Sequence, residues 1–135
     1  MRQNQMKEMP PALRRILLAE DNPVNRQIVI DLLETRGHYV RYATNGLEVL
    51  QALDNDSFDL ILMDAQMPEM DGFQAAAAIR SREKQSGAHV IIIALTGLKA
   101  ETDRVRCLEA GMDGYLGKPI RSDELFDAIE QSLQK

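Results

Sequence analysis

Five polar residues stand where apolar, strand-like segments of this 135-residue chain end. Glu20 and Asp21 follow the first such segment, Asp64 the third, Thr96 the fourth and Lys118 the fifth. The carboxyl ends of parallel strands share one edge of a sheet, so these residues are expected to converge there. Three carboxylates, a hydroxyl and an ammonium group at one place predict a metal-assisted phosphoryl-transfer site.

The chemistry of the acidic residues favours Mg²⁺ as the metal. Mg²⁺ prefers oxygen ligands, and it is usually held by one or two carboxylates together with water and phosphate oxygens. Asp21 and Asp64 fit as direct ligands, and Glu20 fits as a ligand acting through water. Clustered carboxylates repel one another unless a cation compensates them, and Mg²⁺ and Lys118 would provide that compensation.

The elements that would position these residues alternate along the chain. Short apolar segments at 15–19, 38–43, 58–63, 90–95 and 115–116 predict strands, and apolar residues recur at helical spacing after each of them. Helix starts are indicated by Asn45 with Glu48, by Asp71 and by Ser122, and helix stops by Gly37 and Gly111. Five βα units in succession predict a doubly wound α/β fold, with a parallel sheet covered by helices on both faces.

Composition restricts the classes of function. A length of 135 residues suits one domain, and a net charge of -5 disfavours nucleic acid or an anionic membrane as the main partner. Cys107, the single cysteine, excludes an internal disulfide and a cysteine-based zinc cluster; we interpret it as helix packing in a reducing, cytoplasmic compartment. The longest apolar stretch, at 90–95, is too short to span a bilayer. Residues 1–13, with Pro10 and Pro11, are expected to be a tail or linker before a domain at 14–134.

Five segments in order resemble the receiver domains of two-component response regulators, and the resemblance extends over about residues 14–134. They are Leu18-Ala19-Glu20-Asp21-Asn22, Leu62-Met63-Asp64, Met67-Pro68 with Met70-Asp71-Gly72, Ala94-Leu95-Thr96 and Tyr115-Leu116-Gly117-Lys118-Pro119. The stretch Glu20-Asp21-Asn22-Pro23-Val24-Asn25 further resembles the receivers attached to hybrid sensor histidine kinases. The resemblance implies a flavodoxin-like (βα)5 sandwich with the strand order 2-1-3-4-5.

The resemblance also implies roles for individual residues. Asp64 would accept a phosphoryl group from a phosphohistidine, and Thr96 and Lys118 would contact that group. The backbone carbonyl of Gln66 would complete the metal ligands, and Lys118 would form a cis peptide bond with Pro119. Movement of Thr96 would let Tyr115 turn inward and change the face formed by the fourth helix, the fifth strand and the fifth helix.

Plainer interpretations exist for each residue taken alone. Glu20 with Asp21, and Asp64, could each cap the segment that follows, Thr96 could bond only to its loop, and Lys118 could be a surface charge. Tyr115 fits a packed aromatic as well as a switch. His38 and His89 flank strands and are expected to have no catalytic role. Leu98, two residues after Thr96, is expected to limit water access and to prolong the phosphorylated state.

The implied partners are a sensor histidine kinase domain, in cis or in trans, and a histidine phosphotransfer protein. We expect no nucleic acid and no direct membrane contact through this domain, and no enzymatic activity beyond its own phosphorylation and dephosphorylation. The chain fits a stand-alone regulator as well as a piece of a hybrid kinase. The alternative functions are an unphosphorylated interaction module and an aspartyl-phosphate phosphohydrolase. The hydrolase is disfavoured because such enzymes place a second acid two residues after the nucleophile, where this chain has Gln66.

Overall fold

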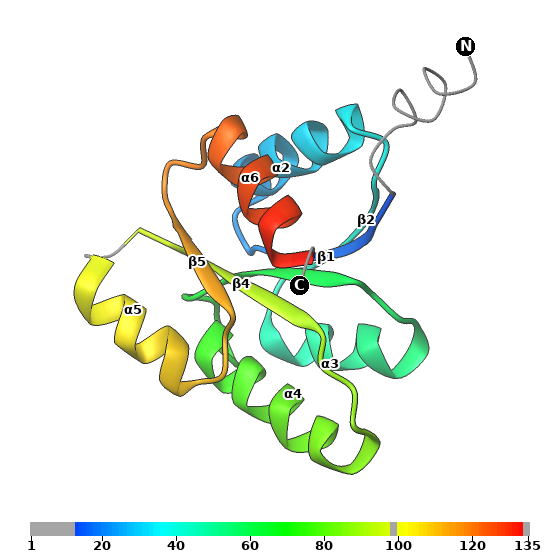
Figure 1. The fold of residues 1–135 in the computed structure, drawn as a ribbon. Coiled ribbons are helices and arrows are strands. Elements are labelled where there is room, and N and C mark those ends of the chain that lie inside the picture. The colour runs from blue at the N-terminus through cyan, green and yellow to red at the C-terminus, as the bar shows by residue number, and fades with distance from the viewer. Residues whose placement is uncertain (1–12, 98–99, 134–135) are drawn as a thin grey trace.

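Five parallel strands form a sheet of order β2-β1-β3-β4-β5 in the computed structural model, which describes residues 13–97 and 100–133 (Figure 1). The strands are β1 (Arg15–Ala19), β2 (Tyr39–Ala43), β3 (Leu60–Asp64), β4 (Ile91–Thr96) and β5 (Gly114–Gly117). The doubly wound topology with order 2-1-3-4-5 is therefore confirmed. The segment predicted as a tail lies outside the described residues, apart from Leu13.

Helices cover both faces of this sheet. They are α2 (Pro23–Thr35), α3 (Gly46–Asn55), α4 (Gly72–Ser86), α5 (Ala100–Glu109) and α6 (Ser122–Leu133). Figure 1 shows α2 and α6 on one face and α3, α4 and α5 on the other. In the part of the chain that the structure describes, none of the helices has the length and apolar character needed to cross a membrane.

Alternation along the central strands divides the core into two layers. Leu17 and Ile61 face α3, α4 and α5, whereas Ile16 and Leu62 face α2 and α6. These side chains are fully buried, and each such residue contributes about 1.5 to 3 kcal/mol relative to an exposed one. A strand that is buried on both faces has an almost continuous apolar sequence, and this pattern allowed the central strands to be predicted.

Four of the five strands have bounds that differ from the sequence prediction by one or two residues. The third strand begins at Leu60 rather than at Phe58, because the Asp59 carboxylate and N–H both bond to the Arg15 backbone, at 2.7 and 2.8 Å. Phe58 is buried although it lies in the loop before β3, so its apolar side chain made the predicted strand begin too early. At the other ends, Asp64 and Thr96 are the last residues of β3 and β4 rather than the residues that follow them.

Most helix ends follow their sequence signals. Asn45 caps α3 by accepting the Glu48 N–H at 2.9 Å, and Asp71 forms a reciprocal capping box with Gln74. Gly37 and Gly111 have φ angles of 84° and 96°, in the left-handed region that ends a helix. The predicted cap at Ser122 is off by one residue, because α6 begins at Ser122 itself.

Candidate functional site

The carboxyl edge of the sheet carries the acidic cluster, defined here as Glu20, Asp21 and Asp64. One carboxylate oxygen from each of the three lies within 4.8 Å of the others. The Lys118 Nζ atom lies 3.1 Å from Asp64 Oδ2 and 3.2 Å from Glu20 Oε1. The parallel topology therefore brings together four residues that are separated by up to 98 positions (118 − 20) in the sequence.

Burial affects the pKa values of the charged groups in and beside this cluster. The side chains of Glu20 and Asp64 are 2% and 6% exposed, and that of Lys118 is 25% exposed. Burial raises the pKa of Glu20, and the neighbouring Asp64 carboxyl raises it further, while Lys118 acts in the opposite direction. Burial acts to lower the pKa of Lys118, but the bonds to Asp64 and Glu20 outweigh burial and raise it.

The donor set fits Mg²⁺. Three carboxylates and one ammonium group leave an excess of two negative charges when all are ionised (−3 + 1 = −2). A divalent cation matches this excess, and carboxylate oxygens are the ligands that Mg²⁺ prefers. Asp21 is exposed, so solvent and a metal can reach the cluster from that side.

The loop that follows β3 holds Asp64 in place through backbone hydrogen bonds. The Gln66 N–H donates to Asp64 Oδ1 at 3.1 Å, and the Ala65 N–H donates to the Leu95 carbonyl at 2.9 Å. Gly72, the first residue of α4, lies so close to Asp64 that a Cβ there would stand 2.4 Å from the Asp64 carbonyl oxygen. Helix α4 can approach the end of β3 only because residue 72 has no side chain.

Thr96 is the last residue of β4, and Lys118 directly follows the neighbouring strand β5. Thr96 is 2% exposed, and its carbonyl accepts the Lys118 N–H at 2.8 Å. The Lys118–Pro119 peptide bond is cis, as the family resemblance implied. Thr96 is thus held beside the lysine that binds Asp64, whereas Leu98 lies outside the described residues.

Tyr115 lies on β5, three residues before Lys118. Its half-buried ring packs against the core layer formed with α3, α4 and α5. A cavity of about 390 Å³ borders it and is also lined by Arg104, Cys107 and Leu108 of α5. Cys107 is 2% exposed, which agrees with its interpretation as helix packing.

Sequence reasoning missed two residues that contact Glu20. The Asn22 N–H donates to Glu20 Oε2 at 3.2 Å, while the Asn22 side chain caps α2. Arg26 donates from Nη1 to the Glu20 carbonyl oxygen at 3.0 Å. Asn22 was inside a recognised motif and its capping role was readable, but a bond from Arg26 to a main-chain carbonyl has no signature in residue type or spacing.

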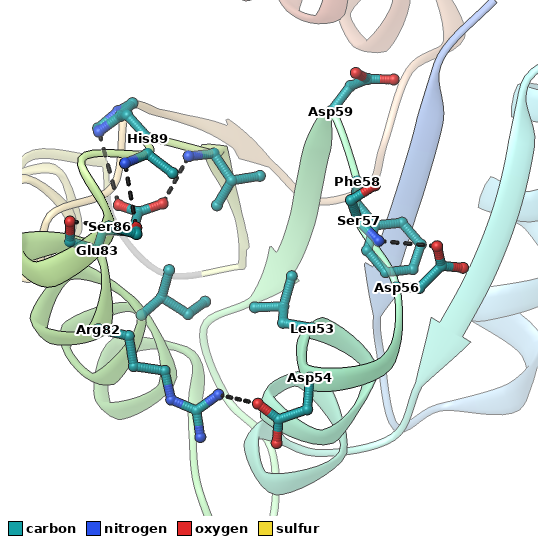
Figure 2. Close-up of a pocket in the computed structure, with 13 residues that line it drawn as sticks. Leu53, Asp54, Asp56, Ser57, Phe58, Asp59, Arg82, Glu83, Ser86 and His89 are labelled. Carbon is teal, nitrogen blue, oxygen red and sulfur yellow. Dashed lines mark hydrogen bonds and ion pairs between the residues drawn. The ribbon is translucent and has the colours of Figure 1, made fainter.

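A larger hollow lies at the opposite edge of the sheet, and Figure 2 shows its lining. Its volume is about 540 Å³, and its walls come from the carboxyl ends of α3 and α4 and from the segments that enter β3 and β4. Several of its polar side chains are paired within the chain, such as Arg82 with Asp54 at 2.8 Å and Glu83 with the Val90 N–H at 2.7 Å. Glu20, Asp21 and Asp64 do not line it, so the acidic edge is the better candidate for chemistry.

Both histidines lie toward that opposite edge. His38 directly precedes β2 and accepts the Arg14 N–H at Nδ1, at 3.1 Å. His89 precedes β4, and its Nε2 atom lies 2.8 Å from Asp113 Oδ1. Neither ring is placed beside the acidic cluster.

Comparison with known proteins identifies the class. The family described as "Response regulator receiver domain" matches residues 16–130, and the chain belongs to this family. Among curated relatives, hybrid signal transduction histidine kinase B of Dictyostelium discoideum is 43% identical over 131 residues, which cover 90% of this chain and 7% of that protein. The chain thus spans a small part of the length of such relatives, which include several hybrid histidine kinases.

Two solved structures extend the comparison to the fold. One is the receiver domain of sensor histidine kinase PA1611 from Pseudomonas aeruginosa PAO1, solved with a magnesium ion coordinated in its active site cleft. It is 36% identical to this chain, with a TM-score of 0.82, and the match covers 92% of this chain and 100% of that one. The other is the receiver domain of Ssk1 from Saccharomyces cerevisiae, solved with the histidine phosphotransfer protein Ypd1. It is 32% identical to this chain, with a TM-score of 0.86, and the match covers 93% of this chain and 91% of that one. This chain is a receiver domain of two-component signalling.

Proposed function

We propose that this receiver domain accepts a phosphoryl group on Asp64 from a phosphohistidine, in a reaction that requires Mg²⁺. The observation that carries the proposal is the Asp64 carboxylate itself. It is almost fully buried, it is bonded to Lys118 at 3.1 Å, and it lies beside two further carboxylates. A cluster with this excess of negative charge is costly to maintain without a cation, and a phosphoryl-transfer site needs one.

We assign the metal ligands from this arrangement. Asp21 and Asp64 would bind the ion directly and Glu20 would act through water. The Gln66 carbonyl, which the family resemblance implies as a ligand, would complete the protein ligands. Mg²⁺, when bound, neutralises negative charge on the phosphoryl oxygens. The PA1611 receiver with its magnesium ion supports this assignment by similarity.

The transfer needs no general base, because a carboxylate is already a nucleophile. An Asp64 oxygen forms the new bond to phosphorus, and the bond between phosphorus and the donor imidazole nitrogen breaks. The electron pair of the broken bond stays on that nitrogen, which can take up a proton from solvent. Lys118 and the Thr96 hydroxyl stabilise the transferred phosphoryl group, whose about 1.5 to 2 negative charges replace the single charge of the ionised Asp64 carboxylate.

Donor docking is expected on the apolar surface beside the acidic cluster. Val24 and Ile28 of α2 are 67% and 50% exposed. A hollow of about 380 Å³ is lined by Ile28, Pro119 and Ile120 together with Glu20 and Lys118. A protein seated there brings its histidine to the acceptor, and we propose a sensor kinase domain, in cis or in trans, or a histidine phosphotransfer protein, as in the Ssk1 complex with Ypd1.

The wider setting follows from these partners. We propose a cytoplasmic signalling domain that catalyses only its own phosphorylation and dephosphorylation and does not bind nucleic acid or a membrane directly. The relatives that are hybrid histidine kinases support a receiver within such a kinase, and a stand-alone regulator is the alternative.

Intact mass spectrometry tests the function. The chain is incubated with a small phosphodonor, with Mg²⁺ or with EDTA, beside an Asp64→Asn variant. We expect one added phosphoryl group on the native chain with Mg²⁺ alone, and none on the variant. If the native chain binds Mg²⁺ and yet accepts no phosphoryl group, either from the small donor or from phosphorylated kinase domains, it is an interaction module instead.

A further inference from the structure

The segment that presents Glu20 and Asp21 is held by a side chain outside the acidic cluster. We infer that Arg26 is a positioning residue for Mg²⁺ binding, an inference that rests on the proposed function. Arg26 lies in the first turns of α2, and its Nη1 atom donates to the Glu20 carbonyl oxygen at 3.0 Å. That carbonyl belongs to the peptide unit that joins Glu20 to Asp21, so its orientation helps to set where both carboxylates point.

The Glu20 carbonyl lies just beyond the strand that precedes it. Strand β1 ends at Ala19, and the Glu20 N–H extends the ladder to β2 by donating to the Ala43 carbonyl at 3.0 Å. Glu20 as a whole is 1% exposed, and a buried carbonyl without a donor costs free energy. Arg26 supplies a charged donor to this carbonyl from α2.

An aromatic ring fixes the guanidinium group in place. The Arg26 guanidinium carbon lies 4.4 Å from the centroid of the Tyr42 ring on edge strand β2. The planar guanidinium can stack on the ring and donate in its own plane to the Glu20 carbonyl, which the ammonium of lysine cannot reproduce. Arg26 therefore ties α2, the segment after β1 and strand β2 together beside the acidic cluster.

Charge and positioning predict opposite results for this residue. A positive charge near the acidic cluster repels Mg²⁺, so on charge alone the loss of Arg26 strengthens binding. If Arg26 instead holds Glu20 and Asp21 in place, its loss weakens binding. Removal of outer-shell contacts to metal ligands typically weakens metal binding 10- to 100-fold, and we expect about tenfold here, because Arg26 acts through the backbone.

Calorimetric titration with Mg²⁺ separates the two interpretations. The native chain is compared with Arg26→Gln and Arg26→Lys, and with Arg36→Gln as the matched control. Arg36 follows the last residue of the same helix, and its guanidinium carbon lies 3.8 Å from the Phe126 ring centroid, so this variant removes the same charge and a similar stacking contact. We expect dissociation constants about tenfold higher for both Arg26 variants and within about twofold of native for Arg36→Gln.

Each outcome decides the inference. Native or tighter Mg²⁺ binding by Arg26→Gln overturns it, and full recovery in Arg26→Lys overturns the geometric argument. If Arg26→Gln does not fold, as judged by thermal unfolding in EDTA, Arg26→Lys and Tyr42→Leu decide: weaker binding supports the inference, and native affinity overturns it. Failure of the native chain to bind Mg²⁺ would instead refute the proposed function, and the inference with it.

Discussion

A single ammonium group balances two buried carboxylates at the centre of this receiver. Lys118 Nζ contacts both Asp64 and Glu20, at 3.1 and 3.2 Å. Burial raises the pKa of Glu20, and the same two bonds raise the pKa of Lys118 against the opposing effect of its own burial. We therefore expect the stability of the metal-free protein and the reactivity of Asp64 to depend on the same side chain.

Lys118→Met should reduce both stability and phosphorylation. Removal of the ammonium leaves two almost fully buried carboxylates without their cation, and we expect a loss of about 2 kcal/mol in the free energy of unfolding. Urea denaturation in EDTA measures this loss, and intact mass after incubation with Mg²⁺ and a phosphodonor measures the slower acceptance. The control is Arg121→Met, because Arg121 and Asp123 form a long, exposed pair at 3.8 Å that should contribute less than about 0.5 kcal/mol. Equal stability of native and Lys118→Met protein would contradict this account of the site.

At the scale of elements, strand ends and helix starts are joined by close approaches and capping bonds. Helix α4 begins against the backbone of Asp64, and α2 begins with the Asn22 cap beside Glu20. At the opposite edge of the sheet, other contacts hold the segments that enter the strands together. One example is the hydrogen bond from the Arg14 N–H to His38 Nδ1. The two edges can therefore be perturbed separately.

Gly72→Ala should destabilise the chain and disturb the acceptor. The added Cβ would stand 2.4 Å from the Asp64 carbonyl oxygen and 3.1 Å from Ala65 Cα, both backbone atoms, so α4 must move. We expect a loss of about 2 kcal/mol, measured by urea denaturation, with slower phosphorylation. Gly114→Ala is the control, since a Cβ there meets no atom within 4 Å. A Gly72→Ala variant that is as stable as Gly114→Ala would show that the close approach is unimportant.

His38 should make stability fall in mildly acidic solution. Burial lowers the pKa of His38, and the positive charges of Arg14 and Arg36 lower it further, with Glu130 acting weakly against them. The unfolded chain takes up a proton near the ordinary histidine pKa of about 6.5, while the folded chain still resists protonation. The stability present above that pH is therefore lost as the pH falls. Protonation at Nδ1 would also remove the acceptor for the Arg14 N–H.

His38→Asn provides the comparison, because the amide oxygen can accept the same N–H but does not titrate. We expect the native chain to lose more stability than this variant between about pH 7.5 and 5.5, as measured by urea denaturation at each pH. Parallel pH profiles for the two proteins would show that His38 makes no such contribution.

In the molecule as a whole, the site and the proposed output surface lie on different elements of one α/β sandwich. Lys118 follows β5, and Tyr115 on the same strand packs toward α5. Helix α5 exposes Val105 and Leu108, which are 54% and 57% accessible. We therefore propose that a change at Asp64 reaches the surface formed by α5, β5 and α6 over a short path through β5.

Thr96→Ala should uncouple phosphorylation from this surface. In the native chain, phosphorylation is expected to shift amide resonances at the site, at Tyr115 and along α5 and α6, because Thr96 moves toward the new group. In the variant, the shifts should stay near Asp64 and Lys118. Proton–nitrogen correlation spectra before and after phosphorylation measure this. Thr35→Ala serves as the control, because Thr35 Oγ1 donates to the Leu32 carbonyl, far from Asp64. Identical patterns of amide resonance shifts in the native and Thr96→Ala proteins would rule out this coupling.

Family resemblance predicted the strand order, and residue types and positions predicted the two-sided core and the cluster of Glu20, Asp21, Asp64 and Lys118. The core and the cluster could be predicted because buried parallel strands read as continuous apolar segments, and because the carboxyl ends of parallel strands share one edge. Residues that act through their own side chains at such ends are visible in residue type and position.

Only the tertiary structure decided the contacts made through the backbone and across elements. Phe58 is buried although it lies outside β3, Gly72 touches the Asp64 carbonyl, and Arg26 reaches the Glu20 carbonyl from α2. Main-chain atoms are the same in every residue, so the sequence carries no sign of which carbonyl a side chain will meet. That choice depends on where the chain turns and how closely the helices pack, and the folded molecule alone fixes both.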